Sequence, residues 1–165
     1  MDATGYLYAM SAVGMSFAGL SVLTMILRQM LGGKMTKFDT FVARSWIQLG
    51  FMVTSGALLP PLLALFEVST PMGWRLSSGL MAIILGSWAM TFPPRRWATN
   101  PGPLPIFVII SVAAMGLIVL ALAANAIAMP VAHLPGVYAA AVTTIFVDAA
   151  MWFLFACAHW YDAVQ

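Results

Sequence analysis

The chain has 165 residues, of which 62% are hydrophobic and only 7% are charged, and its formal net charge at pH 7 is +2. A soluble globular domain carries about 25% charged residues to cover its surface, so this composition excludes an ordinary soluble domain. It also argues against a nucleic-acid-binding protein, because the few basic residues lie outside the apolar runs or at their ends, where membrane topology explains them.

Five segments are apolar enough to cross the hydrocarbon core of a bilayer as helices, which takes about 20 residues each. They are residues 6–27, 45–66, 76–92, 104–129 and 137–158. The third is short, and we expect Pro93 and Pro94 to end it. No connection is long enough to fold separately. The sequence therefore predicts one all-α domain, a polytopic integral membrane protein built as a bundle of five transmembrane helices.

The first segment, residues 6–27, follows Asp2 rather than a basic region, and we expect it to be a retained span and not a signal peptide. Small residues recur along it at 3-4-3 spacing, which places them on one narrow stripe of a helix. Small residues are common in membrane helices, but this spacing favours a packing face for a neighbouring helix or a second copy. The stripe consists of Ser11, Gly14, Ala18 and Ser21.

The second segment contains Pro60 and Pro61. A proline has no N–H, so the carbonyls four residues earlier, those of Gly56 and Ala57, lose their helical donors. In lipid these carbonyls need another partner, such as a side chain, water or a cation. A simple kink relieved by the neighbouring Thr54 and Ser55 hydroxyls is the alternative.

The third segment repeats the spacing of small residues seen in the first, and it predicts a second packing stripe. This stripe consists of Gly79, Ala82, Gly86 and Ala89. The fourth segment is the longest apolar run and ends at Pro130.

The fifth segment has a carboxyl group in its middle. Asp148 lies 11 residues from Val137, which at 1.5 Å per residue is roughly 16 Å deep, near the centre of a core about 30 Å thick. Depths counted from the ends of the other segments predict a thin polar layer at this level. Its members are Asp148, Ser16, Ser55, Ser87 and the backbone at Gly56 and Ala57.

One helical face of the fifth segment leads from the carboxyl group toward the cytoplasmic interface. It carries Thr144, Asp148, Trp152, Phe155 and His159. His159 is a possible proton exit, since imidazole titrates near neutral pH. Three roles stay open for the carboxyl group: a neutral group bonded to a neighbouring helix, a cation or proton site in a water-filled cavity, or an ion pair with a partner protein.

The basic residues predict the orientation. Six of the seven lie in the connections after the first and third segments, and Arg75 alone lies on the other side. The positive-inside rule then places the N-terminus outside and the C-terminus in the cytoplasm. A bacterial inner (plasma) membrane is the expected location.

Groups for most other chemistry are missing. His133 and His159 fall on opposite sides of the membrane, so no metal or haem site is expected, and no second carboxylate accompanies Asp148 for acid–base catalysis. We expect no cofactor and no enzymatic activity.

The sequence favours a small oligomeric ion channel or transporter with a cation or proton site near Asp148. The alternative is a non-catalytic accessory or assembly subunit of a larger membrane complex. The expected partners are membrane lipids and either further copies of the chain or other membrane subunits.

Overall fold

The computed structural model describes residues 3–30, 33, 35–127 and 135–162, with side chains described up to residue 158. It contains five helices: α1 (Ala3–Met30), α2 (Lys37–Leu65), α3 (Thr70–Thr99), α4 (Ile106–Ala126) and α5 (Pro135–Asp162). Each is long and apolar enough to cross a membrane. For the described part of the chain, the predictions of an all-α fold and of five such helices are confirmed.

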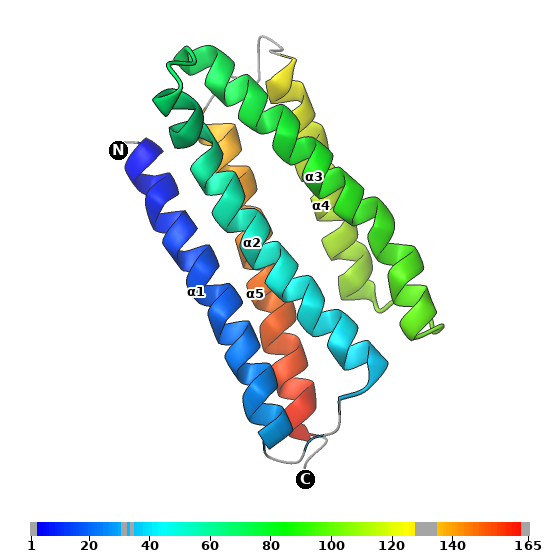
Figure 1. Ribbon diagram of the computed structural model, residues 1–165. Helices are drawn as coiled ribbons and strands as arrows, with labels where there is room; N and C mark the ends of the chain where they lie inside the picture. The colour runs from blue at the N-terminus through cyan, green and yellow to red at the C-terminus, as the bar shows by residue number, and fades with distance from the viewer. Residues whose placement is uncertain (1–2, 31–32, 34, 128–134, 163–165) are drawn as a thin grey trace.

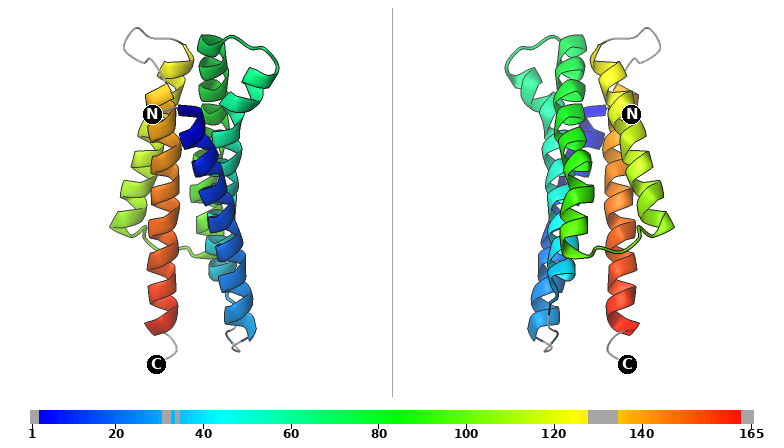
Figure 2. Two further views of the ribbon diagram at one scale, coloured as in Figure 1. Left: turned by 90° about the vertical axis from the view of Figure 1, so that its left-hand side faces the viewer. Right: turned by 90° about the vertical axis from the view of Figure 1, so that its right-hand side faces the viewer.

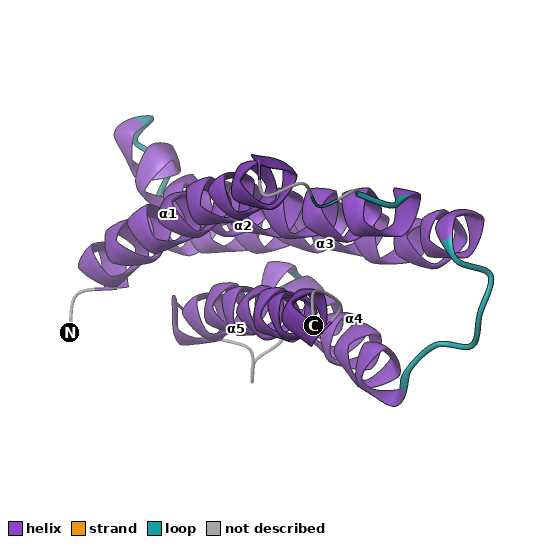
Figure 3. Cartoon of the chain, turned by 90° about the horizontal axis from the view of Figure 1, so that it is seen from below, coloured by secondary structure: helices purple, strands orange, loops and turns teal. Residues whose placement is uncertain are grey.

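Successive helices run in opposite directions along a shared long axis, so α1 begins at one end of the bundle and α5 ends at the other (Figures 1 and 2). Seen along that axis, α1, α2 and α3 form one layer, and α4 and α5 form a second layer against it (Figure 3). The central helix is α2, which contacts α1, α3 and α5. A site enclosed between the layers is therefore built from α2 and α3 on one side and α4 and α5 on the other.

The start of α2 is defined by a capping box, which satisfies N–H groups that lack partners within the helix. The Thr36 hydroxyl accepts from the backbone N–H of Asp39 at 3.1 Å, and the Asp39 carboxylate accepts from the backbone N–H of Thr36 at 2.9 Å. The same carboxylate lies 3.3 Å from an Arg28 guanidinium nitrogen. The end of α1 is thereby tied to the beginning of α2.

The first small-residue stripe lies against α2. A Cβ atom added at Gly14 would lie 2.8 Å from the Thr54 hydroxyl oxygen and 3.1 Å from the Gly50 carbonyl oxygen, so only glycine permits this approach. Across the contact, a Cβ at Gly50 would lie 3.0 Å from the Cβ of Ala18. The Thr54 hydroxyl donates to the Gly50 carbonyl and reaches the Ser11 carbonyl at 3.3 Å. Ser21, the last member of the stripe, is buried.

The second stripe lies along α3 where it contacts α4, at ordinary van der Waals distances. A Cβ at Gly79 would lie 3.5 Å from the Ala126 side chain, and one at Gly86 would lie 3.6 Å from Val119. Ala82 and Ala89, the other two members of the stripe, are half-buried. A buried hydrogen bond from the Asn125 amide to the Ser78 hydroxyl, 2.7 Å long, fastens the same two helices.

Two proline pairs lie inside helices rather than at their ends. Helix α2 continues through Pro60 and Pro61 to Leu65. We expected Pro93 and Pro94 to end the third helix, and this was wrong, because α3 continues to Thr99. A proline has a φ angle that suits a helix, but it removes the bond to the carbonyl four residues earlier and its ring crowds that carbonyl, so the helix continues only where packing offsets this local cost.

Candidate functional site

The predicted mid-membrane layer of hydroxyl groups does not form. Three of its members and the neighbouring threonine of α5 face outward on four different helices: Ser16, Ser55, Ser87 and Thr144. Ser87 donates to the Ile84 carbonyl and Thr144 to the Ala140 carbonyl, each within its own helix. Such local bonds allow a hydroxyl to face an apolar environment. Counting residues along each helix therefore predicted the depth of these side chains in the membrane, but not the direction in which they point.

The carbonyl freed by Pro60 has a partner, but that partner is not Asp148. The Tyr138 hydroxyl donates to the Gly56 carbonyl over 2.7 Å. Tyr138 is fully buried at 0% exposure, as is Ala57. Tyr138 precedes Asp148 by ten residues, or about 15 Å along the helix. Gly56 and Ala57 thus lie outside the surroundings of the carboxyl group.

Asp148 is bonded to α4. The Ser111 hydroxyl donates to the Asp148 carboxylate over 2.5 Å, and the Trp152 indole N–H donates to the same hydroxyl oxygen over 2.7 Å. Ser111 is buried and Asp148 is half-buried. Among the described residues, no lysine or arginine forms an ion pair with this carboxylate. Asp148, Ser111 and Trp152 therefore form a short hydrogen-bonded chain that links α5 with α4.

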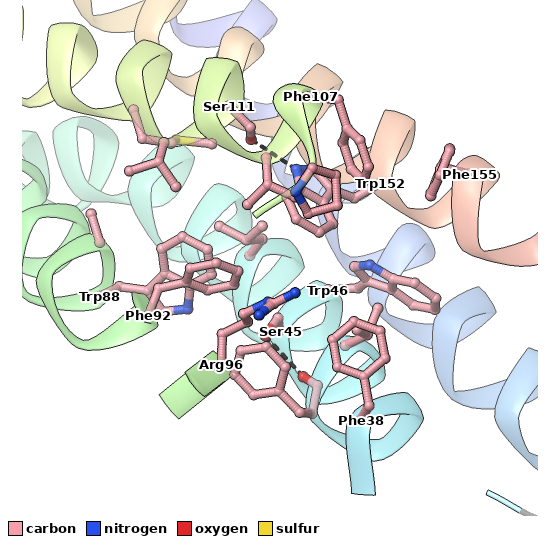
Figure 4. Close-up of a pocket in the computed structure, with 18 of the residues that line it drawn as sticks. Phe38, Ser45, Trp46, Trp88, Phe92, Arg96, Phe107, Ser111, Trp152 and Phe155 are labelled. Carbon is pink, nitrogen blue, oxygen red and sulfur yellow. Dashed lines mark hydrogen bonds between the residues drawn. The ribbon is translucent and has the colours of Figure 1, made fainter. Parts of the chain in front are cut away.

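Ser111 also lines a cavity of about 400 Å³ between the two helix layers, which we call the cleft. Figure 4 shows its side chains converging from four helices. The labelled members are Phe38, Ser45 and Trp46 of α2, Trp88, Phe92 and Arg96 of α3, Phe107 and Ser111 of α4, and Trp152 and Phe155 of α5. The cleft lies in the half of the bundle that contains the α3–α4 connection, since Asn100 and Pro105 also line it.

The walls of the cleft are mostly aromatic. The Trp152 ring packs edge-to-face against Phe107 and Phe92, with centroids 5.1 and 6.0 Å away. Phe107 also contacts Phe155 at 4.4 Å. Of the face that we predicted along the fifth segment, Trp152 and Phe155 therefore line the cleft, with Asp148 bonded to its serine. Thr144 does not join them, and the side chain of His159 lies outside the described residues.

Arg96 is the charged side chain of the cleft. We predicted it as a loop charge that sets topology, but it lies in the last turn of α3 and is only 5% exposed. Its guanidinium donates to the carbonyls of Asn100, Gly102 and Pro103 at 2.5, 2.7 and 3.3 Å. It also lies 6.0 Å from the centroid of the Phe38 ring. The continuation of α3 past its prolines brings this charge inside.

Sequence reasoning missed most of the residues that line the cleft, among them Ser111 and Arg96. Ser111 is the polar residue of "IFVIISVAAM" in the first turns of the fourth segment, where depth from the cytoplasmic end indicated a level near that of Asp148. For Arg96 the sequence carries no such signal. Arg95 and Arg96 are neighbours in the sequence, and which of them points into the bundle depends on the continuation of α3 past its prolines.

No family model, curated protein or solved structure matches the chain. What the cleft can do therefore follows from its own side chains. It offers aromatic surface, one buried guanidinium, and a serine that is bonded to a carboxyl group. In the described part of the chain, no three His, Cys, Asp or Glu side chains lie close enough to hold a metal ion.

Proposed function

We propose that the chain is an integral membrane protein of the transport class, with the cleft as its solute chamber and Asp148 as its proton or cation site. The observation that carries the proposal is the double role of Ser111, which lines the cleft and donates to Asp148. A carboxyl group without a basic partner is costly inside a membrane, and such groups usually mark ion or proton pathways. Here the carboxyl group is bonded to a serine that lines a cavity.

The same geometry favours a carrier over an open pore. A pore formed by several copies around an axis needs polar groups that share one outward face. The outward hydroxyls of this chain belong to four helices, and the Asp148 carboxylate turns toward α4 within the chain. A chamber inside one chain, open toward one side at a time, fits this arrangement better.

The proposed orientation places the cleft on the cytoplasmic side of a bacterial inner membrane. The cleft lies next to the α3–α4 connection, and six of the seven basic residues fall, in the sequence, within this connection and the one between α1 and α2 or within the helix ends that flank them. Positive charge marks the cytoplasmic side of membrane proteins. Solute would enter the cleft from that side, and the proton site would lie beyond it.

Flux through liposomes containing the purified chain tests this proposal. We expect the wild type to move H⁺, or Na⁺ or K⁺, across the membrane faster than empty liposomes do, and Asp148→Asn to abolish that flux. Thr144→Val is the matched control, because it lies one turn away on α5 and faces outward; its flux is expected to equal the wild-type value. Wild-type flux no greater than that of empty liposomes would contradict the proposal.

An accessory role makes a different prediction. A subunit of a larger complex is expected to co-purify from native membranes with an unrelated membrane protein in fixed ratio. Recovery of single chains or homo-oligomers alone, together with the Asp148-dependent flux, would reject that role.

A further inference from the structure

We propose that the cleft binds an amphipathic anion, with its carboxylate, sulfonate or phosphate on Arg96 and its apolar body between the aromatic walls. This substrate class deepens the proposed function and rests on the cleft being the solute chamber. The Arg96 side chain is buried in the cleft wall. A guanidinium withdrawn from water loses its hydration and needs compensating partners nearby.

The partners that Arg96 has in the chain do not neutralise it. All three are backbone carbonyls of the α3–α4 connection, which carry partial charge only. Of the carboxylates whose side chains are described, Asp39 pairs with Arg28, Asp148 bonds to Ser111 and Glu67 follows the far end of α2, and none forms an ion pair with Arg96. Within the described residues, the full positive charge is therefore left for a ligand.

Arg96 also has spare donors for an anion in the cleft. A guanidinium has five N–H groups, and the three carbonyl contacts leave two of them without a described partner. Figure 4 shows the guanidinium among the side chains that line the cleft, near Phe38, Ser45 and Trp46. Arginine binds carboxylates, sulfonates and phosphates because its planar N–H groups form paired bonds with their oxygens.

The rest of the cleft is suited to an apolar or aromatic body. Trp88, Phe92, Phe107 and Trp152 surround the volume beyond Arg96, so flat rings find stacking and edge contacts there. The cavity volume of about 400 Å³ falls within the range of about 300–1,000 Å³ that is usual for small-molecule sites. A hydrophilic anion such as free phosphate would leave these walls unused.

A purely structural role for Arg96 makes the opposite prediction. If the guanidinium served only to hold the α3–α4 connection, the cleft would bind a neutral aromatic molecule as well as its anionic counterpart. Charge selectivity therefore distinguishes the two roles.

Binding to the full-length chain in phosphatidylcholine nanodiscs tests the inference by calorimetry. The probes are naphthalene-2-sulfonate and the neutral, similarly shaped naphthalene-2-sulfonamide. We expect the sulfonate to bind about tenfold more tightly or better, as a charge-assisted hydrogen bond to a buried group implies. In Arg96→Gln this preference is expected to disappear. Arg95→Gln is the matched control, since it removes the same charge from the adjacent residue, which does not line the cleft. Equal affinities for the two probes in the wild type would overturn the inference.

A second variant covers the case in which Arg96→Gln fails to fold. Val112→Phe fills the cleft and leaves Arg96 unchanged, because Val112 lines the same volume. We expect it to lose the binding of both probes, and retained sulfonate affinity would place the binding site elsewhere and overturn the inference.

The nanodisc lipid distinguishes the two possible sources of the anion. At a salt concentration high enough to screen the surface charge of the bilayer, replacing phosphatidylcholine by phosphatidylglycerol weakens sulfonate binding if an anionic lipid is the occupant, and leaves it unchanged if the occupant is a free amphipathic acid. Both results support an anion on Arg96. If the cleft prefers the sulfonate but no Asp148-dependent flux is found, the proposed transport function is rejected and the anion site is kept. If the flux is found without a preference for the sulfonate, the anion site is rejected and the transport function is kept.

Discussion

Tyr138→Phe tests the contact that joins α5 to the proline break of α2. Pro60 has no N–H to offer the Gly56 carbonyl, and the Tyr138 hydroxyl donates to that oxygen over 2.7 Å instead. Since the tyrosine side chain is fully buried, the phenylalanine variant keeps the ring packing and removes one hydrogen bond. The substitution therefore isolates the partner of the freed carbonyl.

The expected loss of stability follows from two typical energy ranges for a lost hydrogen bond. A buried carbonyl left without a donor costs about 1–3 kcal/mol, whereas hydrogen bonds between membrane helices average about 0.6 kcal/mol and reach about 1.7. We expect Tyr138→Phe to lower the free energy of unfolding by about 1–2 kcal/mol, measured by reversible denaturation in mixed micelles. Tyr8→Phe is the control, because Tyr8 is exposed and its change is expected to stay within about 0.5 kcal/mol.

A double-mutant cycle with Pro60→Ala sharpens the test. Alanine restores an N–H at position 60, so the Gly56 carbonyl regains its helical donor and no longer depends on the tyrosine. Tyr138→Phe is then expected to cost at least about 0.5 kcal/mol less than in the wild-type background, which exceeds the usual error of additivity. Equal costs in the two backgrounds would refute the assignment of this hydrogen bond to the freed carbonyl.

Two further predictions concern the packing and the carboxyl group. Gly14→Ala is expected to destabilise the chain by about 1–3 kcal/mol through overpacking against α2. Gly19→Ala is the control and is expected to be neutral or slightly stabilising, because Gly19 has open space around it. Similar unfolding free energies for the two variants would contradict the close α1–α2 contact. Ser111→Ala is expected to shift the infrared carboxyl band that Asp148→Asn removes, because it deletes the donor to that group. Ser87→Ala is its control, and a band unchanged in both variants would show that the serine is not bonded to the carboxyl.

Much of the fold was predictable because membrane-spanning helices are specified by simple features. Run length and composition predicted five helices, and the 3-4 spacing of small residues placed Gly14 and Ala18 on the face that approaches α2. The end of α3 was not predictable in this way. Proline weakens a helix locally, whereas Phe92 packs against Phe41 and Trp152, which lie far along the chain, and Arg96 bonds to the connection that follows α3.

The site was harder to predict than the fold. Counting residues gives position along a helix, and Asp148 lies midway along α5. Its partner is set by the rotation of α4 against α5, which brings Ser111 to Asp148, whereas the rotation of α3 leaves Ser87 facing outward. Rotation depends on the packing of whole helix faces, so no spacing within a single segment indicates it.

The most direct test of the central claim is the access of an aqueous reagent to position 111 beside the carboxyl group. In a Cys157→Ser background, Ser111→Cys in oriented membrane vesicles is treated from the cytoplasmic side with a charged, membrane-impermeant methanethiosulfonate, and Ser87→Cys serves as the lipid-facing comparison. We expect rapid modification at position 111 and none at position 87. A thiol at position 111 that stays unmodified in folded protein would contradict a cleft that connects Asp148 with the cytoplasmic solution.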